Sequence, residues 1–369
     1  MRQRHFHGRT EGDCGMTTKI QRVALVSGAS GVVGRRLAEH LAQQPQWRVI
    51  GIARHAPDDA GPIEWMALDL TDAAAVQAAA HDFSAVTHIF HCARYAHATT
   101  AAEPIEPNLA MLRNLVDATA RHSTALEHVH LVQGSKYYGS ELGPYKTPAQ
   151  ESDPRVLVGN WYYAQEDWLA ERARGKRWRF SASRPHGVCD GELGIVRSMA
   201  RVLAVYAAIS KALGLPLCFP GSAASYRALY QCTDATLLAQ AIAWMATEPK
   251  CAGEACNVTN GDYIRWINLW PRFAEYFGMA CGPVRTVRLA QAMADKAPVW
   301  ERIVAEHDLA PTPFEQTALW PYGDFIFNAG YDIMSDTSKL RRFGFWETVD
   351  TGEMFLRLFD HFRRYRIVP

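Results

Sequence analysis

From residue 21 onward, short runs of β-branched and apolar residues alternate with longer stretches in which apolar residues recur at helical spacing. This alternation is typical of strand–helix–strand units that build a parallel sheet. It predicts helices over residues 32–43 and 108–122, and strands over residues 23–27, 48–54, 63–68, 87–93, 127–134 and 177–185. We therefore expect an α/β fold with a doubly wound parallel sheet of the Rossmann type.

The pattern changes beyond Pro185, where the alternation loosens and aromatic residues crowd several segments, which predicts a smaller, mostly helical region. Its longest apolar stretch, Met199 to Phe219, is interrupted by charged residues and a proline, which favours a buried or pocket-covering helix over a membrane span. Residues 255–262 have the pattern of a strand that returns to the main sheet. We divide the chain into a flexible tail (1–20), a Rossmann domain (21–190) and a substrate-binding region (191–369), with segments around 228–258 rejoining the Rossmann domain.

Composition excludes several classes of ligand. Lys and Arg total 39 and Asp and Glu total 38, so the overall charge gives no reason to expect a nucleic acid or an anionic membrane as partner. The eight cysteines form no Cys-x-x-Cys pairs and no metal-like Cys/His spacing, which predicts neither a disulfide framework nor a metal site. The polar N-terminus lacks the apolar run of a secretory signal. A cytoplasmic protein with a small ligand is expected.

A glycine-rich turn lies between the first predicted strand and the first predicted helix. Gly28, Gly31 and Gly34 form a G-x-x-G-x-x-G pattern there. Glycines at these positions allow a tight turn, a close approach of backbone to a pyrophosphate, and packing of the helix on the sheet. The free N–H groups at the helix N-terminus favour the phosphates, so the turn predicts dinucleotide binding.

The end of the second strand decides between the two nicotinamide dinucleotides. An acidic residue there would bind the 2′-hydroxyl of NAD, but this chain has Arg54 followed by His55. A guanidinium suits the 2′-phosphate of NADP, and an exposed arginine without a ligand is the alternative interpretation. Asp69 and Leu70, after the third strand, fall where a carboxylate can accept a hydrogen bond from adenine. We predict NADPH/NADP as the cofactor.

The candidate catalytic residues depart from the usual short-chain reductase pattern, which is a Tyr and a Lys four residues apart on one helix. Tyr162 and Tyr163 lie at a plausible helix start, but four residues further on are Glu166 and Asp167. A carboxylate there would raise the pKa of the phenol, which is the wrong direction for an acid or an oxyanion hole. Lys136, just after the fifth strand, lies at the carboxyl edge where Rossmann ligands bind, and it is the candidate cation.

These motifs resemble the progesterone 5β-reductase/iridoid synthase-like family of extended short-chain dehydrogenases/reductases. The resemblance runs from residue 21 to residue 369 and rests on GIARH (51–55), GSKYYG (134–139), NWYYAQED (160–167), VYAAISKALG (205–214), NVTNGD (257–262), APVWERIVAEHDLAPT (297–312) and YRIVP (365–369). It implies that Lys136 is the motif lysine and Tyr162 the catalytic tyrosine. The chain departs from the pattern at Tyr137, at Trp161 and at the pair Arg94 and Tyr95, which replaces a tryptophan of plant members and reshapes the substrate pocket.

The resemblance implies NADPH-dependent reduction of the C=C bond of enones and enals. Hydride adds to the β-carbon, and Tyr162, supported by Lys136, stabilises the enolate. The remaining cofactor contacts are expected from Ser30, Val32, Gln133 and Val188. A hydrophobic substrate is expected to contact Arg94, Tyr95, Tyr138, Tyr206, Trp320 and Phe325, although plain core packing is the alternative for each aromatic residue.

Two other functions remain open from the residues. One is a carbonyl reductase or sugar-nucleotide epimerase of the same superfamily, against which the missing Tyr-x-x-x-Lys counts. The other is a non-catalytic NADP-sensing regulatory protein, which would need neither Lys136 nor Tyr162. The expected partner is a small hydrophobic enone or enal, with a homodimer as the candidate assembly.

Overall fold

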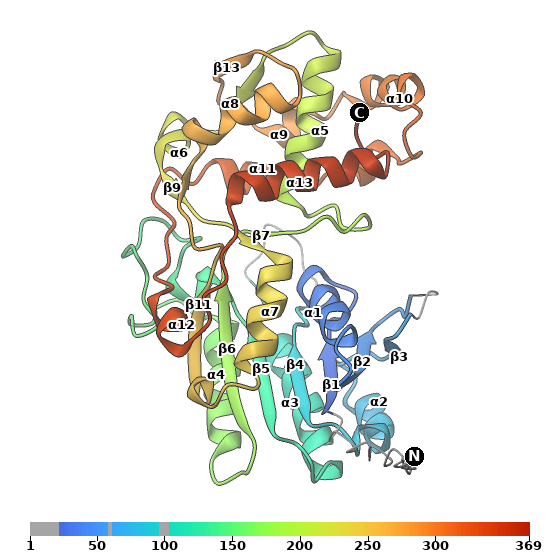
Figure 1. The fold of residues 1–369 in the computed structure, drawn as a ribbon, viewed down its shortest axis with the longest axis vertical. Helices are drawn as coiled ribbons and strands as arrows, with labels where there is room; N and C mark the ends of the chain where they lie inside the picture. Colours follow the sequence, from blue (N-terminus) through green and yellow to red (C-terminus); the bar gives the residue numbers. More distant parts are fainter. Residues whose placement is uncertain (1–21, 58–60, 96–102) are drawn as a thin grey trace, which may run out of the picture.

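The computed structural model describes residues 22–57, 61–95 and 103–369, so the tail predicted over residues 1–20 lies outside the described residues. A seven-stranded sheet with the order β11-β6-β5-β4-β1-β2-β3 forms its lower half in Figure 1. All neighbouring strands in this sheet are parallel. Its strands are β1 (Arg22–Ser27), β2 (Trp47–Ala53), β3 (Glu64–Ala67), β4 (His88–His91), β5 (His128–Val132), β6 (Arg179–Pro185) and β11 (Glu254–Val258). The predicted Rossmann sheet is confirmed, and its strand order reverses between β1 and β4, where such sheets bind ligands.

The alternation of side chains along β1 explains how helices come to cover both faces of the sheet. Ala24 and Val26 face a core that includes residues of α1 (Val32–Ala42) and α7 (Ala235–Met245). Val23 and Leu25 face the opposite core. That second core is covered by α2 (Ala73–Ala78), α3 (Ile105–His122) and α4 (Trp161–Ala173). A strand buried on both faces reads as a continuous apolar run, as the sequence of β1 does.

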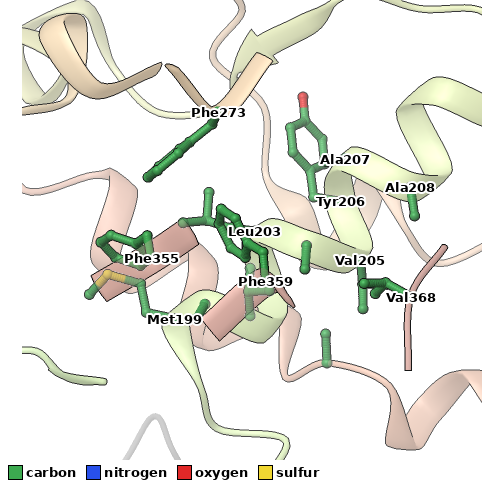
Figure 2. Close-up of a cluster of buried hydrophobic side chains, with 14 of the residues drawn as sticks. Met199, Leu203, Val205, Tyr206, Ala207, Ala208, Phe273, Phe355, Phe359 and Val368 are labelled. Carbon is green, nitrogen blue, oxygen red and sulfur yellow. The ribbon is translucent and has the colours of Figure 1, made fainter. Parts of the chain in front are cut away.

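A helical region lies beyond the carboxyl ends of the strands (Figure 1). Its core centres on α5 (Met199–Ala212), in which residues 199–210 are all buried, so the predicted buried helix is confirmed. Figure 2 shows Met199 and Leu203 of α5 near Phe273, Phe355 and Phe359. The other helices of this region are α6 (Ala223–Arg227), α8 (Trp266–Tyr276), α9 (Leu289–Ala292), α10 (Ala297–Glu306), α11 (Trp320–Phe327) and α13 (Thr351–Arg364). Across the described ranges, no helix has both the length and the apolar character needed to cross a membrane.

Short strand pairs complete the fold. Beside the main sheet, β7 pairs with β10, β8 with β13 and β9 with β12. The strand expected within residues 255–262 is β11, and it lies parallel to β6 at the edge of the main sheet. The remaining elements are β7 (Val188–Cys189), β8 (Leu217–Phe219), β9 (Leu229–Tyr230), β10 (Thr233–Asp234), β12 (Ile264–Arg265), β13 (Cys281–Val284) and α12 (Ser338–Phe343).

Candidate active site

A cavity of about 570 Å³ lies at the carboxyl ends of β1, β2, β4, β5 and β6. Residues that follow these strands form most of its wall, and side chains of α11 complete it from the helical region. This is the crevice in which doubly wound sheets bind their ligands. Fourteen of the predicted site residues line it: Gly28, Ser30, Gly31, Val32, Gly34, Arg54, Asp69, Leu70, Arg94, Gln133, Lys136, Tyr162, Val188 and Phe325.

The glycine-rich turn is shaped by close backbone contacts. Gly28 follows β1 with a φ of +66°, and a Cβ there would lie 2.8 Å from the backbone of Ala93. A Cβ on Gly34 would collide with the carbonyl oxygen of Gly28. Only glycine therefore fits at these two positions, and α1 starts at the cavity wall. The helix N-terminus and the bare backbone form a cradle that fits a pyrophosphate.

The part of the cavity beside β2 and β3 carries two oppositely charged side chains. Arg54 is the first residue after β2, and Asp69 lies two residues beyond β3. The Asp69 carboxylate accepts hydrogen bonds from the hydroxyl of Thr71 at 2.7 Å and its backbone N–H at 2.9 Å. These bonds, with help from the charge of Arg54, lower the pKa of Asp69. His55, also predicted to bind the cofactor, does not line the cavity.

Tyr162 is held at the first turn of α4. The side chain of Asn160, which caps this helix, accepts a hydrogen bond from the Tyr162 backbone N–H and donates one to the Lys136 carbonyl at 2.8 Å. The Tyr162 hydroxyl lies close to Gly134, two residues after β5, where a Cβ would be 3.2 Å from it. Burial, followed by the charge of Glu103, raises the pKa of Tyr162. The phenol is therefore a hydrogen-bond donor at neutral pH.

Lys136 lies in a short 3₁₀ helix (Ser135–Tyr138) after β5, and its ammonium binds Glu103 at 2.6 Å. Glu103 also accepts hydrogen bonds from Trp161 Nε1 at 2.7 Å and Arg94 Nε at 3.1 Å. Burial alone would raise the pKa of Glu103, but its bonds to Lys136 and Arg94 outweigh burial and lower the pKa to about 2. Sequence reasoning missed Glu103, because a glutamate before a helix gives no sign of its distant partners.

The expectation for the carboxylate four residues after Tyr162 needs correction. Glu166 accepts hydrogen bonds from Arg184 at 3.1 Å and from Gln133 at 2.8 Å. Arg184 is only 1% exposed, and its guanidinium lies 3.3 Å from the ring centre of Tyr137. Glu166 thus belongs to a buried polar network, and the raised pKa of Tyr162 comes first from burial.

Four residues predicted to contact the substrate lie away from the cavity wall. The Tyr138 hydroxyl donates to Asn257 Oδ1 at 2.7 Å, and the Tyr206 hydroxyl donates to the Cys218 carbonyl at 2.9 Å. Figure 2 shows Tyr206 on α5 beside the helical core. Trp320 is buried in this same core, and Tyr95 is exposed beyond β4. The structure therefore does not bring these four side chains to the cavity, since an apolar pattern does not distinguish core from pocket.

The structure adds residues that the sequence did not single out. His186, the first residue after β6, lines the cavity, as do Ile195, Arg197, Tyr230, Tyr322 and Ile326 on the side of the helical region. His186 Nδ1 lies 2.6 Å from the Ser135 hydroxyl, and burial lowers its pKa to about 4, so the ring is neutral at pH 7. No group of three His, Cys, Asp or Glu side chains that could hold a metal occurs within the residues described.

Comparisons with known proteins found a matching family model and several similar sequences. A family model described as a PRISE-like Rossmann-fold domain matches residues 69–369. An (S)-8-oxocitronellyl enol synthase of Nepeta racemosa is 34% identical over 94% of this chain and 91% of its own length. A 3-oxo-Delta(4,5)-steroid 5-beta-reductase of Arabidopsis thaliana is 31% identical over 95% of this chain and 94% of its own length.

Solved structures share the fold. The enzyme WbmG of Bordetella bronchiseptica, in complex with NAD, has a TM-score of 0.66 at 17% identity and covers 96% of this chain and 97% of its own. A UDP-glucose 4-epimerase of Thermotoga maritima has a TM-score of 0.67 at 15% identity, over 93% of this chain and 99% of its own. At such low sequence identity, these structures support only the assignment of the fold.

Proposed function

The chain belongs to the PRISE-like Rossmann-fold family and is an NAD(P)-dependent oxidoreductase, and we propose that it reduces the C=C bond of α,β-unsaturated ketones or aldehydes with NADPH. The observation that carries this proposal is the buried Tyr162 hydroxyl at the cavity wall, with Lys136 lining the same cavity and no lysine one turn further along α4. The relatives named above, an enol synthase and a steroid 5-beta-reductase, support the same chemistry.

Arg54 and the glycine-rich turn would hold the cofactor. The cradle at Gly28 and Gly34 fits the pyrophosphate, and the Arg54 guanidinium suits a 2′-phosphate through charge-assisted hydrogen bonds. Asp69 retains acceptor capacity for the adenine amino group beside its bonds to Thr71. When bound, NADPH supplies a hydride for the β-carbon of the substrate.

Tyr162 then acts on the substrate's carbonyl oxygen, where negative charge develops as the β-carbon is reduced. Its hydroxyl donates a hydrogen bond to this oxygen, and an already oriented donor in a water-poor site stabilises the enolate strongly. Lys136 adds positive charge at the same cavity, and Glu103 holds its ammonium in place as a positioning residue. A proton from solvent at the α-carbon completes the reduction, and the carbonyl group is retained.

The experiment identifies the carbon atom of the substrate that receives the hydride. Purified protein receives NADPH deuterated at the transferred position, with cyclohexenone in one reaction and cyclohexanone in the other, and the products are identified by mass spectrometry and NMR. We expect deuterium at the β-carbon of a saturated ketone and no turnover of cyclohexanone. Deuterium at the carbonyl carbon, or comparable rates with both ketones, would instead establish a carbonyl reductase.

A further inference from the structure

Arg197 lines the cavity from the side of the helical region. It lies in the segment between β7 and α5, and its guanidinium carbon is 4.9 Å from the ring centre of Tyr322 on α11. The other residues of this part of the wall are the apolar Ile195, Phe325 and Ile326 and two tyrosines, Tyr230 and Tyr322. A single cationic group in such a wall gives a ligand one strong point of orientation.

The acidic residues closest to Arg197 in sequence are already engaged elsewhere. Asp190 binds Arg36 of α1 at 2.5 Å, and Glu192 binds Arg35 at 3.2 Å. Arg197 itself forms no ion pair with any carboxylate in the described part of the chain. Five N–H donors in a planar fork are available to a guanidinium, and the interaction with the Tyr322 hydroxyl uses only part of them. The remaining donors can bind an anion, which the described residues do not supply as a carboxylate.

The neighbouring cations differ from Arg197 in this respect. Arg94 and Lys136 both bind Glu103, whereas Arg201, one turn further on, donates to the backbone carbonyls of Leu193 and Thr317. The cavity near Tyr162 thus holds three cationic side chains, Arg94, Lys136 and Arg197, against the carboxylate of Glu103. The charge of Arg197 lowers the pKa of Tyr162. Burial has the larger effect and raises this pKa.

The position of Arg197 indicates which ligand it faces. The cradle for the cofactor phosphates lies at the glycine-rich turn and the start of α1, on the sheet side of the cavity. Arg197 and its partner Tyr322 belong to the helical side, together with the apolar residues that suit an organic substrate. The anion that would complete this wall is accordingly part of the substrate.

We propose that the substrate is an enone or enal that carries a carboxylate, which Arg197 binds while the conjugated carbonyl lies at Tyr162. This inference rests on the proposed function and specifies its substrate class. A guanidinium binds a carboxylate through two parallel hydrogen bonds, and the partly buried setting strengthens them. Held at both ends, the substrate presents one face of its C=C bond to the cofactor, so Arg197 also determines specificity.

The test compares two substrates of matched size. One is cyclohexenone that carries a carboxylate on an alkyl linker, and the other is the corresponding primary amide, each made with linkers of several lengths. For the wild type we expect a kcat/KM that is about 10- to 100-fold higher for the best acid than for its amide. Arg197→Met should abolish this preference, because only the acid loses its partner, while Arg197→Lys should retain part of it.

Controls separate the possible failures. Arg364→Met removes an exposed arginine of α13 and should behave as the wild type. The affinity for NADPH should be equal in wild type and Arg197→Met. Wild-type reduction of the amides without any preference for an acid, or an Arg197→Met variant that loses NADPH affinity, would overturn the carboxylate assignment and leave enone reduction intact. If neither series is reduced at the C=C bond, the proposed function itself fails.

Discussion

Tyr162 and Tyr163 are neighbours on α4, but their hydroxyl groups serve different purposes. The Tyr163 hydroxyl donates to the Tyr137 carbonyl at 2.5 Å and accepts from the Val156 backbone N–H at 3.1 Å, so it ties two loops together. The Tyr162 hydroxyl lies at the cavity wall beside Gly134. Adjacent helical residues point about 100° apart, and one tyrosine cannot take the place of the other.

Removal of each hydroxyl tests this division. We expect Tyr162→Phe to lower kcat/KM for a weakly activated enone by about 100-fold, because an oxyanion donor is lost, while NADPH still binds. Tyr163→Phe should keep nearly full turnover but lose about 1 kcal/mol of folding stability with its two hydrogen bonds. Steady-state kinetics and urea unfolding measure the two effects. A larger loss of turnover in Tyr163→Phe than in Tyr162→Phe would contradict the assignment.

The cofactor preference also depends on one residue. Arg54 lines the cavity, whereas the adjacent His55 does not and serves as a control. We expect the wild type to use NADPH well ahead of NADH, and Arg54→Ala to reduce that preference mainly through the KM for NADPH, since the contact is made in ground and transition states alike. His55→Ala should keep the preference. Equal use of both cofactors by the wild type would show that Arg54 binds no 2′-phosphate.

At the scale of elements, Glu103 joins three segments that are distant in sequence. Its carboxylate binds Lys136 of the 3₁₀ helix after β5, Trp161 at the start of α4, and Arg94 after β4. Glu103 itself lies two residues before α3, and its side chain is only 11% exposed. These contacts join the edges of the cavity, so a single carboxylate binds both Lys136 and the residue that precedes Tyr162.

The substitution Glu103→Gln tests this positioning role, because it keeps the size of the side chain and removes its charge. We expect kcat/KM to fall about tenfold through the displaced Lys136. In a Lys136→Met background, the same substitution should cost much less, since the group that Glu103 positions is already gone. Equal losses in both backgrounds would show that Glu103 acts on stability alone, and thermal unfolding of each variant is the control.

Strands and motifs were predictable from the sequence because their causes are local. The run of apolar residues after residue 21 predicted a strand over 23–27, and β1 spans Arg22–Ser27. The glycine pattern likewise identified the turn that lines the cavity. In contrast, Tyr206 and Trp320 were predicted to contact substrate and lie in the helical core instead. Asp190 and Glu192 bind arginines of α1, and Arg197 has no carboxylate partner among the described residues, which no local pattern reveals.

For the whole molecule, the sheet buries a group of histidines without charged partners. His88 and His91 of β4 and His128 and His130 of β5 are all buried. Burial lowers their pKa values, to about 3 for His88, to about 4 for His91 and His128, and well below the usual value for His130. The His130 ring is held by the hydroxyls of Ser181 at 2.8 Å and Ser183 at 3.0 Å. All four rings are therefore neutral in the folded protein at pH 7.

These histidines link stability to pH in a definite direction. In the unfolded chain a histidine has a pKa of about 6.5, whereas the buried rings protonate only near pH 4 or below. Between these values the unfolded state binds more protons than the folded state, so the free energy of unfolding falls as pH falls. The stabilisation is complete above about pH 6.5 and is lost progressively toward pH 4. Two carboxyl groups, Glu141 and Glu151, have pKa values raised by burial and act in the opposite direction.

The substitution His130→Asn measures how much one histidine contributes to this dependence of stability on pH. Asparagine can still bond to the serine hydroxyls but does not titrate, so the stability of the variant should depend less on pH. Between pH 6 and pH 5 we expect its unfolding free energy to fall less steeply than that of the wild type, by up to about 1.4 kcal/mol per pH unit. Urea unfolding at several pH values measures both slopes, and the opposing carboxyl groups are common to both proteins.

His307→Asn, which replaces an exposed histidine, should keep the wild-type slope. An unchanged slope in His130→Asn would mean that this ring is protonated within the folded sheet, contrary to its burial and its serine partners.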